Sequence, residues 1–557
     1  MHRFGFVKLL FMILGPILLN ACGGAAPVPP DAQTVQCAGP DAQSGLETLP
    51  DPSLPSQWHL QNTGQSGGRA GEDIRARAAW ERLKRAGCGP GAGVRIAVLD
   101  LAVDLNHPDL IDNRATGLSY DYLSGWATEP LPRWNGTDTA EKLAHGTSVA
   151  GIIAARAGNS LGGAGVAPQA QLAGFNPLAG SPDRVGEYIN DALTRNLESI
   201  DVYHNSWGSL DGGKLSKASA GFSETIERGL LNGRGGLGAL YVFAAGNGGC
   251  LGYPSSNCRP DVDRSNYDGY LNHRGVIVAC AFDHNGELPI WAERGSNLLA
   301  CGPSGPARVL PEGNTTSAIT TTALNGSMVS DFSNSSASAP MVSGVIALML
   351  SANVKLSARD VRLILARSAR RNDPLNPDWQ AGRQGGHGYH PGFGFGAVDA
   401  DAAVALARAW TSIGDERSLR KCQASSRTSE SAAWSLAIPD NQSTGVSHGL
   451  NLDDSCPITR VEHVEIRLVI DHAYIGDLAI DLQSPAGTTS SLASQRDCGN
   501  RSKNVTDDCG SYNENWPIAS VRHLDEPARG QWRLTIADRI PGKSGTLNAW
   551  QILVWGR

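Results

Sequence analysis

Hydrophobic and polar positions follow two different patterns in the two halves of the chain. In the first half, short apolar runs such as 94–99 and 241–245 lack regular alternation, which is typical of strands buried on both faces. Small-residue stretches at 145–157 and 340–350 indicate helices, and Pro340 fits a first helical turn because a residue there needs no N–H donor. Strands that alternate with helices predict an α/β domain with a mostly parallel central sheet.

From residue 433 onward the pattern becomes a regular alternation. Residues 461–470, 477–482 and 531–536 alternate apolar and polar side chains, and Gly or Pro turns separate them. This pattern predicts an all-β sandwich, because one face of each strand packs inward while the other meets solvent. The Ser-, Arg- and Lys-rich stretch before it indicates a linker between the two domains.

The N-terminus has the features of an export signal. Arg3 and Lys8 flank an apolar run at 9–19 that is too short to span a bilayer. The run leads into Leu-Asn-Ala-Cys, which resembles a bacterial lipobox and implies lipidation of Cys22; an ordinary signal peptide is the alternative. The predicted segments are a leader at 1–22, a flexible tether at 23–48, the α/β domain at 49–410, the linker at 411–432 and the sandwich at 433–557.

Charge and cysteine usage narrow the partners and the compartment. The net charge of -7 gives no sign of the basic face that nucleic-acid binding requires. If one of the eleven cysteines carries a lipid, ten remain for disulfides in an oxidising compartment. Short separations favour two pairs and elimination adds three: Cys250–Cys258, Cys498–Cys509, Cys280–Cys301, Cys422–Cys456 and Cys37–Cys88. We therefore expect a lipid-anchored protein of the bacterial cell envelope.

Asp, His and Ser occur in this order, each in a setting that suits acyl transfer. Asp100 ends a predicted strand, His145 begins HGTSVAG, and Ser336 lies in SSASAP. A serine hydroxyl needs an imidazole to take its proton, and the imidazole needs a carboxylate to orient it. Because His145 is expected at a helix N-terminus, we expect its pKa to be lowered. Taken singly, these residues have structural alternatives, such as a turn-capping Asp or a core His.

A glycine-flanked asparagine, Asn247, follows the apolar run 241–245. Such a residue can form a simple turn, or it can donate its side-chain N–H to the oxyanion of a tetrahedral intermediate. The Asp-His-Ser series favours the second interpretation. The sequence therefore predicts a serine endopeptidase.

Together these segments resemble the subtilisin-like serine proteases, and more closely the kexin/furin branch, the proprotein convertases. The resemblance extends over residues 49–557 and includes DPSLPSQWHLQN, HPDL, HGTSVAG, SWGSLDGGK, YVFAAGNGG and NYDGY. Further on, IGDLAIDLQSPAGT and GQWRLTIAD resemble the P (Homo B) domain, a jelly-roll sandwich that accompanies this branch. The resemblance implies a subtilisin-like α/β domain followed by an all-β jelly roll, acting as a monomer on proteins or peptides.

The resemblance also implies individual site residues. The triad would be Asp100, His145 and Ser336, with Asn247 as the oxyanion donor and Ser206, Trp207 and Gly208 as the edge that pairs with substrate. Asp268, with Asp211 nearby, implies a basic P1 residue, Arg or Lys; a turn Asp is the alternative. Two Ca²⁺ sites are implied, which could instead be solvated surface acids. Their ligands would be Asp51, Asp109 and Asn159 with the carbonyls of Arg156, Leu161 and Gly163, and Asp211, Asp263 and Glu293.

The chain departs from the convertase pattern at several places. Non-acidic residues stand at four positions where the family has acids: Leu101, Lys142, Leu210 and Lys217. Strict dibasic or multibasic recognition is therefore not expected. Asn334-Ser335 replaces Gly-Thr before the nucleophile, and Asn tolerates a left-handed backbone. Residues 23–48 are too few for the usual chaperone prodomain, so we expect folding without one or with help in trans. A broad-specificity protease, and an inactive adhesion protein that works through its sandwich, are the alternatives.

Overall fold

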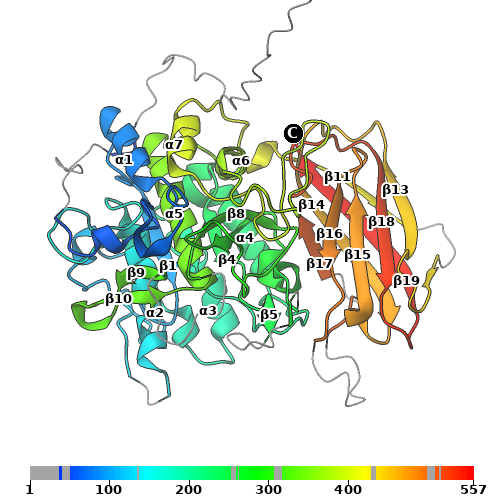
Figure 1. Cartoon of the computed structure of the whole chain (residues 1–557), viewed down its shortest axis with the longest axis horizontal. Helices are drawn as coiled ribbons and strands as arrows, with labels where there is room; N and C mark the ends of the chain where they lie inside the picture. Colours follow the sequence, from blue (N-terminus) through cyan, green and yellow to red (C-terminus); the bar gives the residue numbers. More distant parts are fainter. Residues whose placement is uncertain are drawn as a thin grey trace, which may run out of the picture. The chain divides into compact units, whose positions relative to one another are not determined.

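The structure is a computed structural model in which most of the chain from residue 50 onward is described (Figure 1). The described residues are 37–39, 50–134, 137–251, 259–260, 262–306, 317–427, 434–498, 509–512 and 516–557. The predicted leader with Cys22, most of the predicted tether, and Cys258 lie outside these ranges.

A six-stranded parallel sheet forms the centre of the first domain, in the order β2-β1-β3-β4-β7-β8. Its strands are β1 (Arg95–Leu99), β2 (Gln171–Phe175), β3 (Val202–Asn205), β4 (Leu240–Ala244), β7 (Val276–Phe282) and β8 (Leu298–Pro303). Two antiparallel pairs lie outside it: β9 (Ile319–Thr322) with β10 (Met328–Phe332), and β5 (Cys250–Leu251) with β6 (Arg259–Pro260). Every residue of β3, β4 and β7 is buried, which confirms the predicted α/β domain.

Helices cover both faces of this sheet (Figure 1). They are α1 (Ala76–Arg85), α2 (Ala140–Ala154), α3 (Val185–Ala192), α4 (Phe222–Asn232), α5 (Ser335–Ala352), α6 (Ala358–Ser368) and α7 (Ala400–Arg408). Adjacent residues of β3 point to opposite faces: Tyr203 donates its hydroxyl to the Arg195 carbonyl just after α3, whereas His204 contacts α5. By length and composition α5 could cross a membrane, but 94% of it is buried in the domain, as expected of a core helix.

Two helices begin earlier than the sequence analysis predicted. α2 begins at Ala140, where the side chain of the N-cap residue Thr139 accepts a backbone N–H at 3.3 Å, so His145 lies inside the helix. α5 begins at Ser335, so Pro340 lies within the helix rather than in its first turn. A capping side chain satisfies one of the unpaired N–H groups at a helix start, and small-residue content alone does not reveal where that happens.

Two antiparallel sheets form the second domain. One has the order β11-β19-β14-β17 with β12 added alongside β19, and the other has the order β13-β18-β15-β16. The strands are β11 (Arg420–Ser425), β12 (Leu436–Ile438), β13 (Val446–Leu452), β14 (Val461–His472), β15 (Leu478–Gln483), β16 (Thr489–Ala493), β17 (Trp516–Ser520), β18 (Gly530–Asp538) and β19 (Gly545–Gly556). Their inward side chains form a hydrophobic core of their own, which confirms the predicted all-β sandwich.

The predicted linker at 411–432 is wrong in part. Residues 420–425 form β11, which pairs with β19 along its whole length. Only Cys422 is buried among the six residues of this strand. Because an exposed edge strand carries Lys, Arg and Ser, its composition resembles that of a linker.

Four of the five predicted disulfides are present among the described residues. They are Cys37–Cys88, Cys280–Cys301, Cys422–Cys456 and Cys498–Cys509. The fifth, Cys250–Cys258, stays a prediction because Cys258 lies outside the described residues. The short separation of Cys498 and Cys509 predicts one of these pairs, and elimination predicts the other three.

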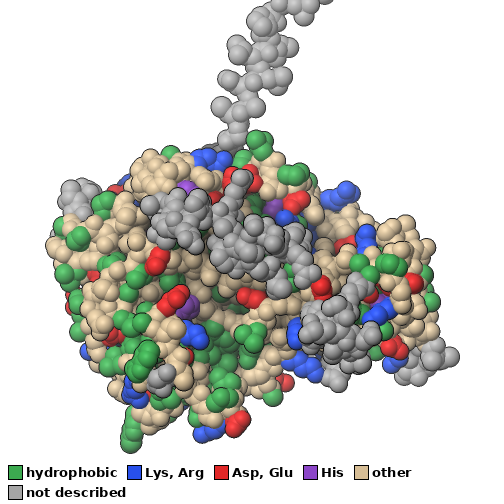
Figure 2. All heavy atoms as spheres, turned by 60° about the horizontal axis from the view of Figure 1, so that its bottom comes forward, with side chains coloured by type: hydrophobic (Ala, Val, Ile, Leu, Met, Phe, Trp, Pro, Cys, Tyr) green, Lys and Arg blue, Asp and Glu red, His purple; other side chains and the backbone are tan. Residues whose placement is uncertain are grey.

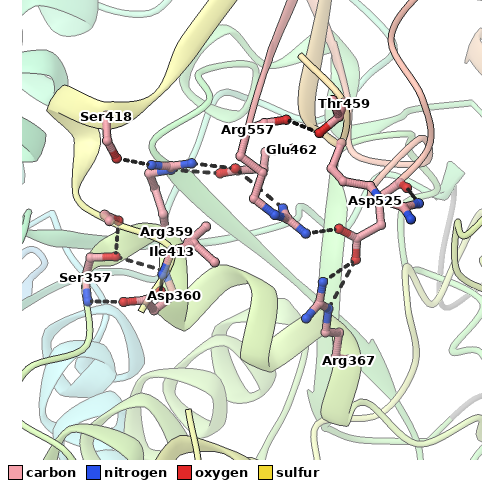
Figure 3. A network of polar contacts seen from close by, with 12 residues as sticks. Ser357, Arg359, Asp360, Arg367, Ile413, Ser418, Thr459, Glu462, Asp525 and Arg557 are labelled. Carbon is pink, nitrogen blue, oxygen red and sulfur yellow. Dashed lines mark hydrogen bonds and ion pairs between the residues drawn. The ribbon is translucent and has the colours of Figure 1, made fainter. Parts of the chain in front are cut away.

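Buried ion pairs join the two domains (Figure 3). Arg359 of α6 donates to both carboxylate oxygens of Glu462 on β14, at 2.9 and 2.6 Å. Arg367 at the end of the same helix, and Arg557, both donate to Asp525. Burial raises the pKa of Asp525, but its charged and hydrogen-bonded partners lower it by more. The carboxylates at this interface are therefore paired with cations of the chain itself.

Candidate active site

Asp100 and His145 meet at the carboxyl end of the parallel sheet. Asp100 directly follows β1, and its Oδ2 atom lies 2.8 Å from Nδ1 of His145 on α2. The other oxygen of Asp100 accepts the N–H of Leu101 at 2.7 Å, which fixes the carboxylate. The residue after the histidine needs to be glycine, because a Cβ atom on Gly146 would lie 2.2 Å from the carbonyl oxygen of Ala102. This geometry leaves Nε2 of the imidazole directed away from the carboxylate.

The pKa of His145 is raised, contrary to the expectation from the sequence. Burial lowers the pKa of this imidazole, but the charge and the hydrogen bond of Asp100 raise it by more. Since α2 starts at Ala140, the ring does not sit at a helix N-terminus. The Asp100 carboxylate therefore stabilises the imidazolium, which is the form that a general base takes after it accepts a proton.

Ser336 lies in the first turn of α5 and lines the same cavity as His145. Its Oγ atom donates to the carbonyl oxygen of Ser206 at 3.4 Å, a long hydrogen bond. Without substrate, the bond between a nucleophile and its base is often long or poorly aligned and tightens only in the complex. Ser336 thus faces the same cavity as His145, while the backbone of the predicted substrate-pairing segment holds its hydroxyl.

A buried histidine that the sequence analysis missed, His204, is linked by hydrogen bonds to the backbone of Ser336. Nδ1 of His204 lies 2.8 Å from Oγ of Ser343, and Nε2 lies 2.7 Å from Oγ of Ser206. Ser206 Oγ in turn donates to the carbonyl oxygen of Ser336 at 3.2 Å. That oxygen is available because Pro340, four residues further along α5, has no N–H to donate. Burial lowers the pKa of His204 to about 3, so a neutral ring links Ser343 to the nucleophile's backbone.

Asn247 occupies the turn that follows β4. Its Oδ1 atom accepts the N–H and the hydroxyl of Ser335, at 2.9 and 2.7 Å. This orientation leaves the Nδ2 group as the donor for the pocket that Asn247 and Ser336 both line. A flanking glycine is required because the φ angle of Gly246 is +101° and its Cβ would lie 2.2 Å from a Glu293 oxygen.

Asn334, just before α5, adopts a backbone conformation that is almost confined to glycine. Its φ angle is +66° and its ψ angle is -177°. A non-glycine residue in this region stores roughly 1–3 kcal/mol of strain. The expected tolerance of Asn for a positive φ is observed, although ψ is extended rather than left-handed helical. The Ser304 hydroxyl donates to the Asn334 carbonyl at 2.7 Å and helps hold the turn.

A pocket of about 150 Å³ opens beside Ser336. Its lining includes the predicted substrate-binding residues Ser206, Trp207, Gly208, Asp211 and Asp268. Asp268 accepts the N–H groups of Ser209 and Tyr270 at 2.7 and 2.8 Å. Burial raises the pKa of its carboxyl group. A Cβ atom on Gly208 would lie 2.7 Å from Asp268 Oδ2, so the glycine makes room for the acid.

Three carboxylates meet next to this pocket. Oxygens of Asp211, Asp263 and Glu293 lie within 4.8 Å of one another. Asp263 accepts the N–H groups of Gly212 and Gly213 at 2.5 and 2.9 Å. Burial raises the pKa of all three acids, and repulsion within the cluster raises those of Asp263 and Glu293 further. Closely grouped hard oxygen donors of this kind fit a Ca²⁺ ion.

The other predicted calcium ligands also lie together. Asp51 accepts two backbone N–H groups from the loop 156–163, at 2.7 and 3.1 Å. Asp109 accepts the Asn159 amide at 2.8 Å and the N–H of Gly163 at 3.0 Å. Burial raises the pKa of Asp109 to about 6, and the charge of Asp51 contributes. The predicted carbonyl ligands in the same loop are Arg156, Leu161 and Gly163. Two carboxylates and one amide also fit Ca²⁺, with fewer negative charges than the cluster of Asp211, Asp263 and Glu293.

Two side chains at this site gave no signal in the sequence. His204 is one polar residue in a buried strand, and Arg496, which contacts the turn at Gly213, belongs to the sandwich. Only the fold brings them to the pocket. Among the non-acidic substitutions, Leu210 lines the pocket and is 92% exposed.

A model of the subtilase family matches residues 91–396, which is more than half of the chain. The chain belongs to the subtilase family, a family of serine endopeptidases. A model of the proprotein convertase P-domain matches residues 461–554, within the sandwich. Both matches confirm the resemblance identified from the sequence motifs.

Convertases are prominent among the relatives of this subtilase. It is 32% identical over 512 residues to proprotein convertase subtilisin/kexin type 6 of Homo sapiens, covering 91% of this chain and 48% of that protein. It is 31% identical to furin of Homo sapiens, with coverages of 91% and 58%. It is also 31% identical to a dibasic-processing endoprotease of Schizosaccharomyces pombe, with coverages of 91% and 66%. The chain spans about half the length of the first of these relatives.

Solved structures match this subtilase along nearly its whole length. The serine protease of Aeromonas sobria has a TM-score of 0.76 and 25% identity, covering 96% of this chain and 100% of that chain. The complex of that protease with a chaperone gives a TM-score of 0.75 at 26% identity, covering 91% and 95%. The pairing of a subtilisin-like domain with a β-rich second domain is therefore shared with a solved protease.

Proposed function

We propose that this subtilase is an endopeptidase that cleaves after Arg or Lys. The observation that carries the proposal is the 2.8 Å contact between Asp100 and His145, beside Ser336 and Asn247. His145 takes the Ser336 proton at Nε2 as Oγ attacks the substrate carbonyl carbon, and Asn247 Nδ2 donates to the oxyanion. His145 then gives the proton to the leaving amine, and a water molecule, deprotonated in the same way, releases the acyl group.

The pocket suits a cationic P1 side chain. The half-buried carboxylate of Asp268 is held by two backbone N–H groups, and a carboxylate removed from water gains from a cationic partner. The segment 206–208 lines the pocket with backbone that an extended substrate can join as a further strand. A relative named as a dibasic-processing endoprotease agrees with a basic P1 residue. Leu210 and Lys217 replace acids, so a second basic residue upstream is not required.

Calcium is proposed as the resident cofactor at both acidic sites. The first would use Asp51, Asp109 and Asn159, and the second would use the acidic cluster beside the pocket, whose carboxylates lie within 4.8 Å of one another. A bound Ca²⁺ ion supplies positive charge that stabilises the ionised acids. The loops that carry the acids would then keep the pocket in shape.

We also infer export to the cell envelope. The disulfides of the described residues are typical of oxidising compartments. A lipid on Cys22 would anchor the chain through its tether. Replacing Cys22→Ser should move the protein from the membrane fraction to the soluble fraction. If the Cys22→Ser protein stays with membranes, the lipid anchor is wrong.

Peptide cleavage tests the proposed activity. The chain without residues 1–22 and its Ser336→Ala variant are compared on fluorogenic peptides that end in Arg or in Leu, with calcium or with a chelator. We expect cleavage of the Arg peptide, and a loss on the order of 10⁶ in kcat for Ser336→Ala. A Ser338→Ala variant in the same helix serves as the control that retains activity.

Each failure of this test has its own meaning. No cleavage by either form contradicts the protease proposal and favours an adhesion protein that works through its sandwich. Equal cleavage of the Arg and Leu peptides favours a broad-specificity subtilase and overturns the role given to Asp268.

A further inference from the structure

The sandwich domain packs directly on the wall of the substrate pocket. The Leu215 N–H donates to the Cys509 carbonyl oxygen at 2.9 Å. The Tyr267 hydroxyl donates to the Ser494 carbonyl oxygen at 3.2 Å and accepts the Ser494 N–H at 3.0 Å. Tyr267 is part of the sandwich's hydrophobic core, although it directly precedes Asp268 in the chain. The segments next to the pocket residue Asp268 therefore pack against the second domain.

Arg496 of the sandwich contacts the turn beside the pocket. It is 5% exposed, and its Nε atom donates to the Gly213 carbonyl oxygen at 2.5 Å. Its guanidinium carbon lies 3.9 Å from the centre of the Tyr267 ring, a cation–π contact. A planar guanidinium can donate along its edge and stack on its face at once, which a Lys ammonium group cannot do.

The turn that Arg496 holds is the turn that orients the acidic cluster. Gly213 donates its N–H to Asp263 at 2.9 Å, so Arg496 and Asp263 bind the same residue through its C=O and its N–H. The φ angle of Gly213 is +76°, and a Cβ atom there would lie 2.5 Å from a carbonyl oxygen. Three residues further on, Ser216 pairs with Asp268 in a parallel bridge. One arginine therefore supports the backbone segment that contacts both Asp263 of the acidic cluster and Asp268.

We propose that Arg496 is a positioning residue of the substrate pocket: it holds the Gly213 turn in the geometry in which the cluster binds calcium and Asp268 receives the P1 side chain. This inference rests on the calcium site and the basic P1 preference proposed for this subtilase. Removing a group that orients metal ligands typically weakens metal binding by about 10–100-fold. The sandwich then takes part in substrate selection as well as in stability.

The sign of the effect separates positioning from charge alone. Arg496 carries a positive charge next to an acidic cluster, so a pure charge effect would make calcium bind more tightly in Arg496→Met. Positioning predicts the opposite, and it predicts the same loss in Arg496→Lys, which keeps the charge but not the planar contact. We expect both variants to bind calcium at the acidic cluster about 10-fold more weakly, and at the Asp51–Asp109 site with unchanged affinity. We also expect a similar fall in the ratio of kcat/KM for the Arg peptide over the Leu peptide.

Arg522 provides the matched control. It is a buried arginine of the same domain, and it donates to the carbonyl oxygens of His387 and Ala381 at 3.0 and 2.9 Å, not to the pocket turn. Arg522→Lys and Arg522→Met should lower the melting temperature of the chelator-treated protein without changing its calcium affinity or its P1 preference. Calcium affinity is read from isothermal titration and from the calcium-dependent melting shift, independently of activity.

Two results would overturn the inference. One is unchanged or tighter calcium binding in the Arg496 variants, and the other is equal weakening in the Arg522 variants. If Arg496→Met does not fold, the Lys variant alone carries the test. If the unmodified chain shows neither a calcium response nor a P1 preference, the proposed function itself is wrong. That outcome is read from the unmodified chain alone and so is distinct from a failure of the Arg496 inference.

Discussion

Two groups of buried carboxylates in this molecule are compensated in opposite ways. At the domain interface, Glu462 and Asp525 are paired with arginines, and His387 together with the arginines lowers the pKa of Asp525. Beside the pocket, Asp263 and Glu293 face each other, and burial and repulsion raise the pKa of both. The interface acids complete the packing of two domains. The pocket acids accept hydrogen bonds from backbone N–H groups, and their negative charge is left to be balanced by a cation from outside the chain.

The largest expected effect comes from breaking the interface. Glu462→Ala leaves Arg359, whose side chain is 1% exposed, as an unpaired buried cation. Loss of one partner of a buried pair lowers the free energy of unfolding by about 3–5 kcal/mol, measured by urea denaturation. Glu465→Ala is the control, because its partner Arg467 is 40% exposed, and its effect should stay under about 1 kcal/mol. An equal loss in both variants would remove the distinction drawn at the interface.

Calcium removal should produce the next largest effect, confined to the two proposed calcium sites. Free calcium at about 100 times its Kd adds about 2.7 kcal/mol to the free energy of unfolding, and a chelator removes this contribution. Asp263→Asn should abolish the part of the calcium response that comes from the acidic cluster and leave the part from the Asp51–Asp109 site, whereas Asp525→Asn should destabilise the chain but leave the whole response intact. A calcium response of unchanged size in Asp263→Asn would mean that no ion binds at the cluster.

The pH dependence should have opposite signs at the domain interface and at the proposed calcium site of Asp51 and Asp109. Without calcium, the pKa of Asp109 is raised from 3.8 to about 6, so the folded chain holds more protons than the unfolded chain between these values. The free energy of unfolding therefore falls as pH rises through this window, by about 1.4 kcal/mol per pKa unit for such a group. Asp525, with a lowered pKa, loses its contribution as pH falls below 3.8. Because calcium competes with protons, its stabilising effect should grow from pH 5 to pH 7.

A smaller effect should separate rate from stability. His204→Asn breaks the contacts with Ser343 and Ser206, so kcat should fall about 10-fold, or 1.4 kcal/mol, with KM unchanged. His59 is the matched control: it is also fully buried with a pKa lowered to about 3, and its ring nitrogens have no hydrogen-bond partner among the described residues. His59→Asn should lower the melting temperature and leave kcat unchanged. A fall in kcat in both variants would reduce His204 to a packing residue.

The smallest effect concerns strain at the nucleophile. Asn334→Gly relieves a backbone with φ +66° and ψ -177°, and the gain should exceed the entropy that glycine adds to the unfolded chain. We expect an increase of about 1 kcal/mol in the free energy of unfolding. Asn325→Gly, where φ is +58° and ψ is +32°, tests an ordinary left-handed turn and should change stability by less than about 0.5 kcal/mol. No gain at residue 334 would mean that its surroundings already offset the strain.

Much of the fold and of the candidate site could be predicted because the signals are local. Apolar runs predict the first domain, alternating strands predict the second, and the glycines around Asn247 indicate a turn. Helix starts were less predictable, because Thr139 caps α2 through one side-chain contact. The composition of strand β11 predicts a linker instead, because only Cys422 of its residues is buried.

The sequence by itself determined the family, the two-domain order, four of the disulfides and the residues proposed for the chemistry, since each of these depends on residue types at fixed spacings. Tertiary structure alone decided which groups support that chemistry. Three features depend on contacts between segments that are far apart in the chain. They are the raised pKa of His145, the contacts of His204 with α5 and the hydrogen bond from Arg496 to Gly213. Their energies depend on burial and distance, which arise only when the sheet, the helices and the sandwich have packed together.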